Sequence, residues 1–189
     1  HRPEAMTPPR VRAAGDTHPG LQRDQNEDRF FFDDKSGLYC VVDGVGGHAA
    51  GERAAEIAAD LLRTSLAGGW PDETRLRTAF SRANDAIYEA ASRDVTLRGM
   101  ACVATLAAVA DGRVRFAHIG DTRLYKIHDG AIAKLSHDQS PVGELEDAGA
   151  LTETDVAQRP WRDVHGFPEA VRRGASASSR TPAVVTGSV

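Results

Sequence analysis

Hydrophobic residues along the chain follow two kinds of pattern, short apolar runs and longer segments with helical spacing. The short runs are rich in β-forming residues and are bounded by glycine or aspartate, which is typical of buried strands that end in turns. They predict strands at 29–32, 38–42, 102–109, 114–119, 123–127 and 131–135, with a first edge strand at 11–16. Apolar residues that recur every three or four positions predict a helix over 72–93 and a helix that contains 54–62. Ser140 as N-cap, Pro141 at the first position and Gly149 at the end predict a short helix over 140–149.

The turns between these strands predict how the strands pair. Asp-Gly pairs at 111–112 and 129–130 are strong hairpin signals, and the turn at 33–37 joins the strands on either side of it in the same way. Two amphipathic helices flank these hairpin-linked strands. We therefore expect an α/β fold of the α+β type, with two layers of mostly antiparallel sheet covered by helices.

Composition changes at both ends of the chain and suggests the domain boundaries. Residues 1–10 are polar with three prolines, and residues 158–189 carry five arginines and two acids without any period of 2 or 3.6. Such segments are typical of disorder. The sequence predicts a disordered lead-in over 1–10, one domain over 11–157, and a divergent, disordered tail over 158–189.

Overall composition narrows the class of protein. The chain has 189 residues, 41% of them hydrophobic, and a formal net charge of −4, so nucleic acid is not an expected partner. The longest nearly apolar run, 100–110, is too short to span a membrane. Cys40 and Cys102 lie in apolar runs and are interpreted as reduced core residues. Together these features predict a cytoplasmic protein without a membrane anchor; the oligomeric state stays open.

The most informative stretch is 38–51, in which an apolar strand runs into Asp43 and a glycine-rich turn before a helix. A carboxylate at the end of a buried strand is unfavourable unless something pairs with it. Mg²⁺ and Mn²⁺ favour carboxylate and carbonyl oxygens, and glycine allows a carbonyl such as that of Gly44 to come close to the same ion. The alternative is a tight turn with a solvated aspartate.

Four other charged positions fall near the same end of the expected sheet. A hairpin would bring Asp28, preceded by Glu27, to the level of Asp43, and Asp121 follows another strand next to a glycine. Arg23 offers a planar donor fork that suits phosphate oxygens. The alternative for each is an ordinary charged loop or turn residue, since such residues are common on protein surfaces.

With these residues in place, the chain resembles the metal-dependent protein serine/threonine phosphatases of type 2C, also called the PPM family, in their bacterial form. The matching stretches are GLQRDQNED at 20–28, VVDGVGGHAAGE at 41–52, IGDTRLY at 119–125 and LSHDQS at 135–140. They occur in the family's order, and four ordered motifs are a much stronger signal than one. The resemblance covers about 11–157 and implies a sandwich of two antiparallel sheets with helices on both outer faces.

The resemblance also implies an activity and a set of site residues. The expected reaction is hydrolysis of phosphoserine or phosphothreonine in proteins by a metal-activated water, with Mn²⁺ or Mg²⁺ as cofactor. By resemblance, Asp43 bridges two metal ions and the Gly44 carbonyl binds one of them. Glu27 and Asp28 match the family's first acidic pair, Asp121 matches an acid associated with a third metal, and Arg23 matches the arginine that holds the substrate phosphate. A phosphorylated protein, and a serine/threonine kinase or its targets, are the implied partners.

The sequence departs from the family in several places. Val45 stands where some family members carry a histidine, and we do not assign His48, three residues further on, as a general acid. The Gly-Thr-Thr run that the family often has near 99–105 is absent. The family's later Asp-Gly turn and final acidic pair, each of which provides a metal ligand, have no match after 157; Asp163 is the one aspartate there. A shifted reading frame is one interpretation of this change.

These departures predict that the chain, with part of the metal site unmatched, is a weak or inactive phosphatase. Two other functions stay open at this point. One is a non-catalytic, phosphatase-like binding or regulatory domain, and the other is a metal-free structural domain with solvated acidic turns.

Overall fold

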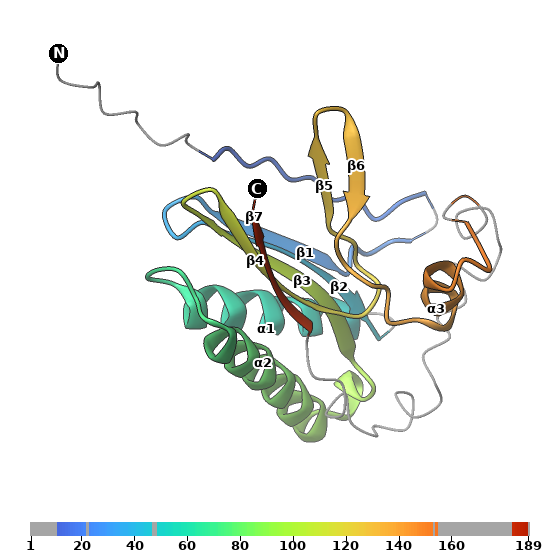
Figure 1. Cartoon of the computed structure of the whole chain (residues 1–189). Helices are drawn as coiled ribbons and strands as arrows, with labels where there is room; N and C mark the ends of the chain where they lie inside the picture. Colours follow the sequence, from blue (N-terminus) through green and yellow to red (C-terminus); the bar gives the residue numbers. More distant parts are fainter. Residues whose placement is uncertain (1–10, 22, 47–48, 153, 155–182, 189) are drawn as a thin grey trace, which may run out of the picture.

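The computed structural model describes residues 11–21, 23–46, 49–152, 154 and 183–188. Five antiparallel strands form one sheet in the order β1-β2-β3-β4-β7, and two further strands form a separate sheet, β5-β6 (Figure 1). The strands are β1 (Asp28–Asp33), β2 (Leu38–Val45), β3 (Ala101–Ala110), β4 (Arg113–Ile119), β5 (Tyr125–His128), β6 (Ala131–Lys134) and β7 (Ala183–Ser188). The predicted α+β fold with antiparallel sheets is confirmed.

Two long helices, α1 (Ala49–Leu66) and α2 (Glu73–Arg93), cover one face of the large sheet (Figure 1). A 3₁₀ turn, η1 (Val95–Leu97), follows α2. The Asp72 carboxylate accepts a hydrogen bond of 2.7 Å from the Arg75 backbone N–H, so α2 starts where the sequence predicted. A short helix, α3 (Pro141–Asp147), begins at an analogous N-cap, Ser140.

The core lies between the large sheet and these two helices. Residues of β2 alternate between buried and more exposed positions, as expected for a strand with one buried face. Cys40 and Val42 point into the core with Leu106 of β3, and the helices contribute Leu62 and Leu76. This packing fixes the strands of the sheet relative to each other and therefore fixes where their ends lie.

Two predicted features differ from the structure. Residues 11–16 do not form the expected edge strand; instead, Gly15 packs directly over the Phe30 ring, where a Cβ would lie 2.6 Å from the ring. Residues 183–188 fall in the segment predicted to be disordered, yet they form β7, which pairs with β4 in antiparallel register. The free edge of β4 offers backbone donors and acceptors that this β-forming segment satisfies. The rest of the predicted tail and the lead-in lie outside the described residues.

An ion-pair network connects the loop before β5 with β6, α3 and the segment before α3. Arg123 donates from Nε and Nη2 to Asp138 Oδ2, at 2.9 and 2.6 Å, and from Nη2 to Glu146 Oε2, at 2.9 Å. Lys134 Nζ donates to Glu146 Oε1 at 2.9 Å. The side chain of Asp138 is only 5% exposed, so this network is largely shielded from water. We call these four residues the Arg123 network.

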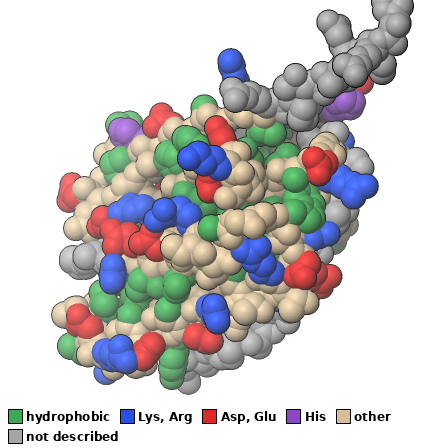
Figure 2. Space-filling model, turned by 90° about the vertical axis from the view of Figure 1, so that its left-hand side faces the viewer, with side chains coloured by type: hydrophobic (Ala, Val, Ile, Leu, Met, Phe, Trp, Pro, Cys, Tyr) green, Lys and Arg blue, Asp and Glu red, His purple; other side chains and the backbone are tan. Residues whose placement is uncertain are grey.

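Charged side chains of both signs are interspersed on the face of the molecule that Figure 2 shows. Among the described residues, no helix has both the length and the apolar character that crossing a bilayer requires.

Candidate active site

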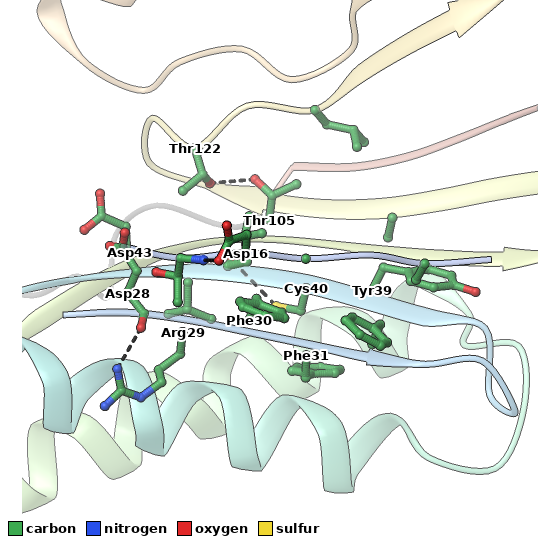
Figure 3. A pocket seen from close by; sticks show the side chains of 18 of the residues that line it. Asp16, Asp28, Arg29, Phe30, Phe31, Tyr39, Cys40, Asp43, Thr105 and Thr122 are labelled. Carbon is green, nitrogen blue, oxygen red and sulfur yellow. Dashed lines mark hydrogen bonds between the residues drawn. The ribbon is translucent and has the colours of Figure 1, made fainter. Parts of the chain in front are cut away.

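The hairpin of β1 and β2 places Asp28 directly opposite Asp43. The turn helps to set this register, because Asp33 Oδ1 accepts hydrogen bonds from the backbone N–H groups of Lys35 and Ser36, at 3.0 and 3.4 Å. Figure 3 shows both carboxylates at the same end of the sheet. The structure thus brings together the two acids that the sequence predicted to lie at one level.

Asp43 lies in a markedly acidic environment. Burial, followed by the negative charges of Asp28 and Asp121, raises the pKa of the Asp43 carboxyl to about 7, while Arg23 acts in the opposite direction. Three carboxylates therefore interact electrostatically at the ends of β1, β2 and β4. A cation would relieve their mutual repulsion.

Glu27 lies against a cradle formed by two glycines. The Gly44 N–H donates to the Glu27 carbonyl oxygen at 3.2 Å, and a Cβ on Gly44 would lie 2.1 Å from the Gly51 carbonyl oxygen. A Cβ on Gly51, in α1, would lie 2.5 Å from Glu27 Oε1. The end of β2, the start of α1 and Glu27 can approach this closely only because both positions lack a side chain.

The carboxylate of Glu27 is also only partly satisfied. Its Oε1 atom is buried without a hydrogen-bond partner, while Oε2 lies 3.9 Å from Nη1 of Arg23. A buried carboxylate oxygen without a donor requires an explanation, and a metal ion or water at this position would supply one. Arg23 itself is about half exposed and can therefore be reached from solvent.

The oxygen atoms gathered at this site are chemically suited to bind a hard divalent cation. It contains the carboxylates of Glu27, Asp28, Asp43 and Asp121 and the carbonyl of Gly44, all of them oxygen ligands of the kind that Mg²⁺ and Mn²⁺ prefer. However, no three acidic, histidine or cysteine side chains in the described part of the chain are arranged as a closed metal-binding group. His48 and Asp163 lie outside the described residues.

Asp28 and Asp43 line one groove of about 420 Å³ on the face of the sheet opposite α1. Its walls include Phe30 and Thr105 (Figure 3) as well as Val41. The acids thus border an open, largely apolar groove from which they can be reached.

Sequence reasoning missed two groups of residues beside this site. Arg29 donates from Nη1 to the carbonyl oxygens of Asn26 and Asp28, at 3.0 and 2.7 Å, and its Nη2 contacts Glu52 of α1. The second group is a buried chain of hydrogen bonds through Thr105 and His118. Arg29 and Glu52 are 23 residues apart in the sequence, and Thr105 and His118 are 13 apart, so no local pattern predicts these two contacts.

Comparison with known proteins places the chain in a family. Residues 15–165 match the model of the family described as protein phosphatase 2C. The chain belongs to the protein phosphatase 2C family. A serine/threonine phosphatase, stp, of Listeria innocua is 32% identical over 157 residues, which are 78% of this chain and 62% of that protein. The serine/threonine protein phosphatase PstP of Mycobacterium tuberculosis is 32% identical over 160 residues, 82% of this chain and 30% of that protein.

Solved structures of phosphatase 2C relatives share the fold. The crystal structure of the M. tuberculosis serine/threonine phosphatase PstP/Ppp superposes with a TM-score of 0.75 at 25% identity, covering 92% of this chain and 72% of that one. A structure of the PstP catalytic domain in complex with two manganese ions gives a TM-score of 0.71 at 26% identity, covering 92% and 70%. The chain thus spans only 62% of the length of the Listeria relative.

Proposed function

We propose that this chain is a metal-dependent protein serine/threonine phosphatase that hydrolyses phosphoserine and phosphothreonine in protein substrates. The observation that carries the proposal is the pairing of Asp28 with Asp43 across the β1–β2 hairpin, where burial and then the nearby charges of Asp28 and Asp121 raise the pKa of Asp43 to about 7. Membership of the phosphatase 2C family and a relative that binds two manganese ions support the same assignment.

Each site residue receives a role that its position supports. Asp43, central among the acids, would bridge two Mn²⁺ or Mg²⁺ ions, with the Gly44 carbonyl, Glu27 and Asp28 as further ligands. Asp121 would serve a third ion. Arg23, half exposed and 3.9 Å from Glu27, would bind the phosphate of the incoming substrate through its guanidinium fork.

Divalent ions bound at such a site supply Lewis-acid chemistry, which generates a nucleophile from water at neutral pH and offsets charge on the phosphoryl oxygens. The chain's own residues hold the negative charge that attracts these ions and orient the phosphate. Because the described residues do not form a closed ligand group by themselves, we expect weak metal binding and low turnover. We further propose a serine/threonine kinase that generates the substrate as the functional partner.

The two thiols of the chain bear on where it acts. Cys40 and Cys102 are both free, and burial raises the pKa of Cys102 to about 12, which keeps this thiol protonated and unreactive. Unpaired cysteines suit a reducing compartment, and the cytoplasm stays the predicted location.

The test compares three proteins on a phosphothreonine peptide with Mn²⁺: the wild type, Asp43→Asn and Asp111→Asn. Asp111 is an exposed turn residue at the far end of β3, and asparagine tolerates its positive φ of 50°, so this variant makes the same charge change away from the site. We expect Asp43→Asn and chelation to abolish hydrolysis and Asp111→Asn to leave it unchanged. Equal turnover by wild type and Asp43→Asn would refute the assignment.

A non-catalytic phosphoprotein-binding domain is the second candidate; the half-exposed Arg23 guanidinium and the buried Oε1 of Glu27, which has no hydrogen-bond partner, favour it over a metal-free structural domain. Calorimetric titration with Mn²⁺ separates these functions. Binding of Mn²⁺ and of the phosphopeptide without turnover would support the binding domain. No binding of either would leave only a structural role.

A further inference from the structure

His118 of β4 is buried, with 1% of its surface exposed, and both of its ring nitrogens are engaged. Nε2 lies 2.9 Å from the carbonyl oxygen of His137, and Nδ1 lies 2.8 Å from Oγ1 of Thr105 on β3. Thr105 Oγ1 in turn lies 2.6 Å from Oγ1 of Thr122, in the loop after β4 (Figure 3). Four residues from three separate segments thus form one continuous hydrogen-bonded chain.

The donor-to-acceptor order of these hydrogen bonds follows from the chemistry of the partners. A carbonyl oxygen can only accept, so Nε2 of His118 carries the proton. Burial lowers the pKa of the ring, which keeps it neutral and leaves Nδ1 as an acceptor for the Thr105 hydroxyl. Having donated its only proton, Thr105 must accept from Thr122. The order is therefore Thr122 to Thr105 to His118 to the His137 carbonyl.

Thr122, the first donor in this series of hydrogen bonds, directly follows Asp121, a candidate metal ligand that is itself exposed. Gly120, on the other side of Asp121, exchanges two hydrogen bonds with Gln139: its N–H donates to Oε1 at 3.2 Å, and its carbonyl accepts from the Gln139 N–H at 2.7 Å. Both neighbours of Asp121 are thus attached to buried structure. The Gly120 backbone also approaches β3 so closely that a Cβ would lie 2.1 Å from Val103 Cγ1.

We propose that Thr122, Thr105 and His118 are positioning residues that hold the loop at 120–122 so that Asp121 faces the acidic cluster. This inference rests on the proposed function, in which Asp121 is a metal ligand. None of the three contacts the reacting atoms. They act on the metal site through the backbone on the C-terminal side of Asp121, as residues that orient a ligand do in other metal sites.

The experiment uses Thr105→Val, which removes the hydroxyl but keeps a similar shape, and Thr105→Ser, which keeps the hydroxyl. Affinity for Mn²⁺ is measured by calorimetry. We expect Thr105→Val to weaken Mn²⁺ binding about tenfold, the lower end of the range for residues that orient ligands, and Thr105→Ser to retain most of the affinity. Thr122→Val, which breaks only the hydrogen bond between Thr122 and Thr105, should weaken Mn²⁺ binding in the same direction but no more than Thr105→Val, which also breaks the one to His118.

A double-substitution cycle shows whether the effect passes through Asp121. In an Asp121→Asn background, Thr105→Val should cause no further loss of Mn²⁺ affinity, because the ligand it positions is already gone. Independent, multiplying effects would overturn the proposal, and so would wild-type affinity in Thr105→Val. Urea unfolding of each variant separates these changes from a general loss of folding.

A second measurement needs no metal. Amide hydrogen exchange of the peptide spanning 119–124 should be faster in Thr105→Val than in wild type or Thr105→Ser. If the wild type binds no Mn²⁺, the proposed function fails, while this measurement still decides whether the loop is held as described. Unchanged exchange would overturn the positioning role whatever the metal does.

Discussion

Replacing Arg123 by methionine should destabilise the protein substantially, because this change removes the centre of the Arg123 network. The substitution leaves the Asp138 carboxylate 5% exposed and without either of its hydrogen bonds from the guanidinium. Breaking a buried ion pair by removing one partner typically costs about 3–5 kcal/mol. Lys134 still compensates Glu146, and the Arg123 side chain is 22% exposed, so we expect a loss of about 3 kcal/mol, at the lower end of that range.

The assay is urea unfolding at pH 7, followed by far-UV circular dichroism. Arg93→Met is the matched control, because Arg93 and Glu89 form an ion pair on α2 in which both side chains are more than half exposed. Exposed pairs contribute at most about 1 kcal/mol. Adding Asp138→Asn to Arg123→Met should restore part of the loss, since it removes the uncompensated charge. If Arg123→Met lost no more stability than Arg93→Met, the network would not be acting as a buried one.

Three further predictions concern other parts of the molecule. Gly51→Ala should weaken Mn²⁺ binding in calorimetry, since the new Cβ would lie 2.5 Å from Glu27 Oε1, while the free energy of unfolding in urea changes little because alanine favours the helix by about 1 kcal/mol. Burial lowers the pKa of the His118 ring in the folded protein, so the unfolded chain binds a proton at this ring more readily. The contribution of neutral His118 to the free energy of unfolding is therefore fully present above pH ~6.5, and the free energy of unfolding falls as the pH drops below that value. His118→Gln should flatten that part of the stability profile in urea titrations at pH 7.5 and 5.5, and an unchanged slope would contradict this. Leu76→Ala should cost about 2–5 kcal/mol in urea unfolding because the side chain is fully buried, whereas Leu145→Ala, at a residue 48% exposed, should have a much smaller effect.

Local signals in the sequence were sufficient to predict the elements that meet at the site. The apolar runs at 29–32 and 38–42 and the turn at 33–37 predict a hairpin, and the register of that hairpin sets Asp28 opposite Asp43. The N-caps at Asp72 and Ser140 were predictable for the same reason, because a cap depends only on residues within one turn of the helix.

Contacts between distant segments were not predictable in this way. Thr105 and His118 lie in apolar strands, where a hydrophobic pattern indicates burial but not which polar group will be met inside. Arg123 and Asp138 are 15 residues apart and belong to different segments. The prediction of an edge strand at 11–16 was wrong because strand propensity cannot distinguish pairing with an edge from packing over a ring. β7 was missed because its partner, β4, lies more than 60 residues earlier.

The antiparallel register of β1 and β2 makes the β1–β2 turn a remote determinant of the acidic cluster. Five residue steps, about 17 Å, separate Asp33 at the turn from Asp28 at the site. Because successive side chains of a strand point to opposite faces, adding or deleting a single turn residue would shift Asp28 by one position and turn it away from Asp43. The length of the β1–β2 turn thus determines whether Asp28 and Asp43 face each other. Insertions and deletions in this surface loop should therefore be far less tolerated than its exposure suggests.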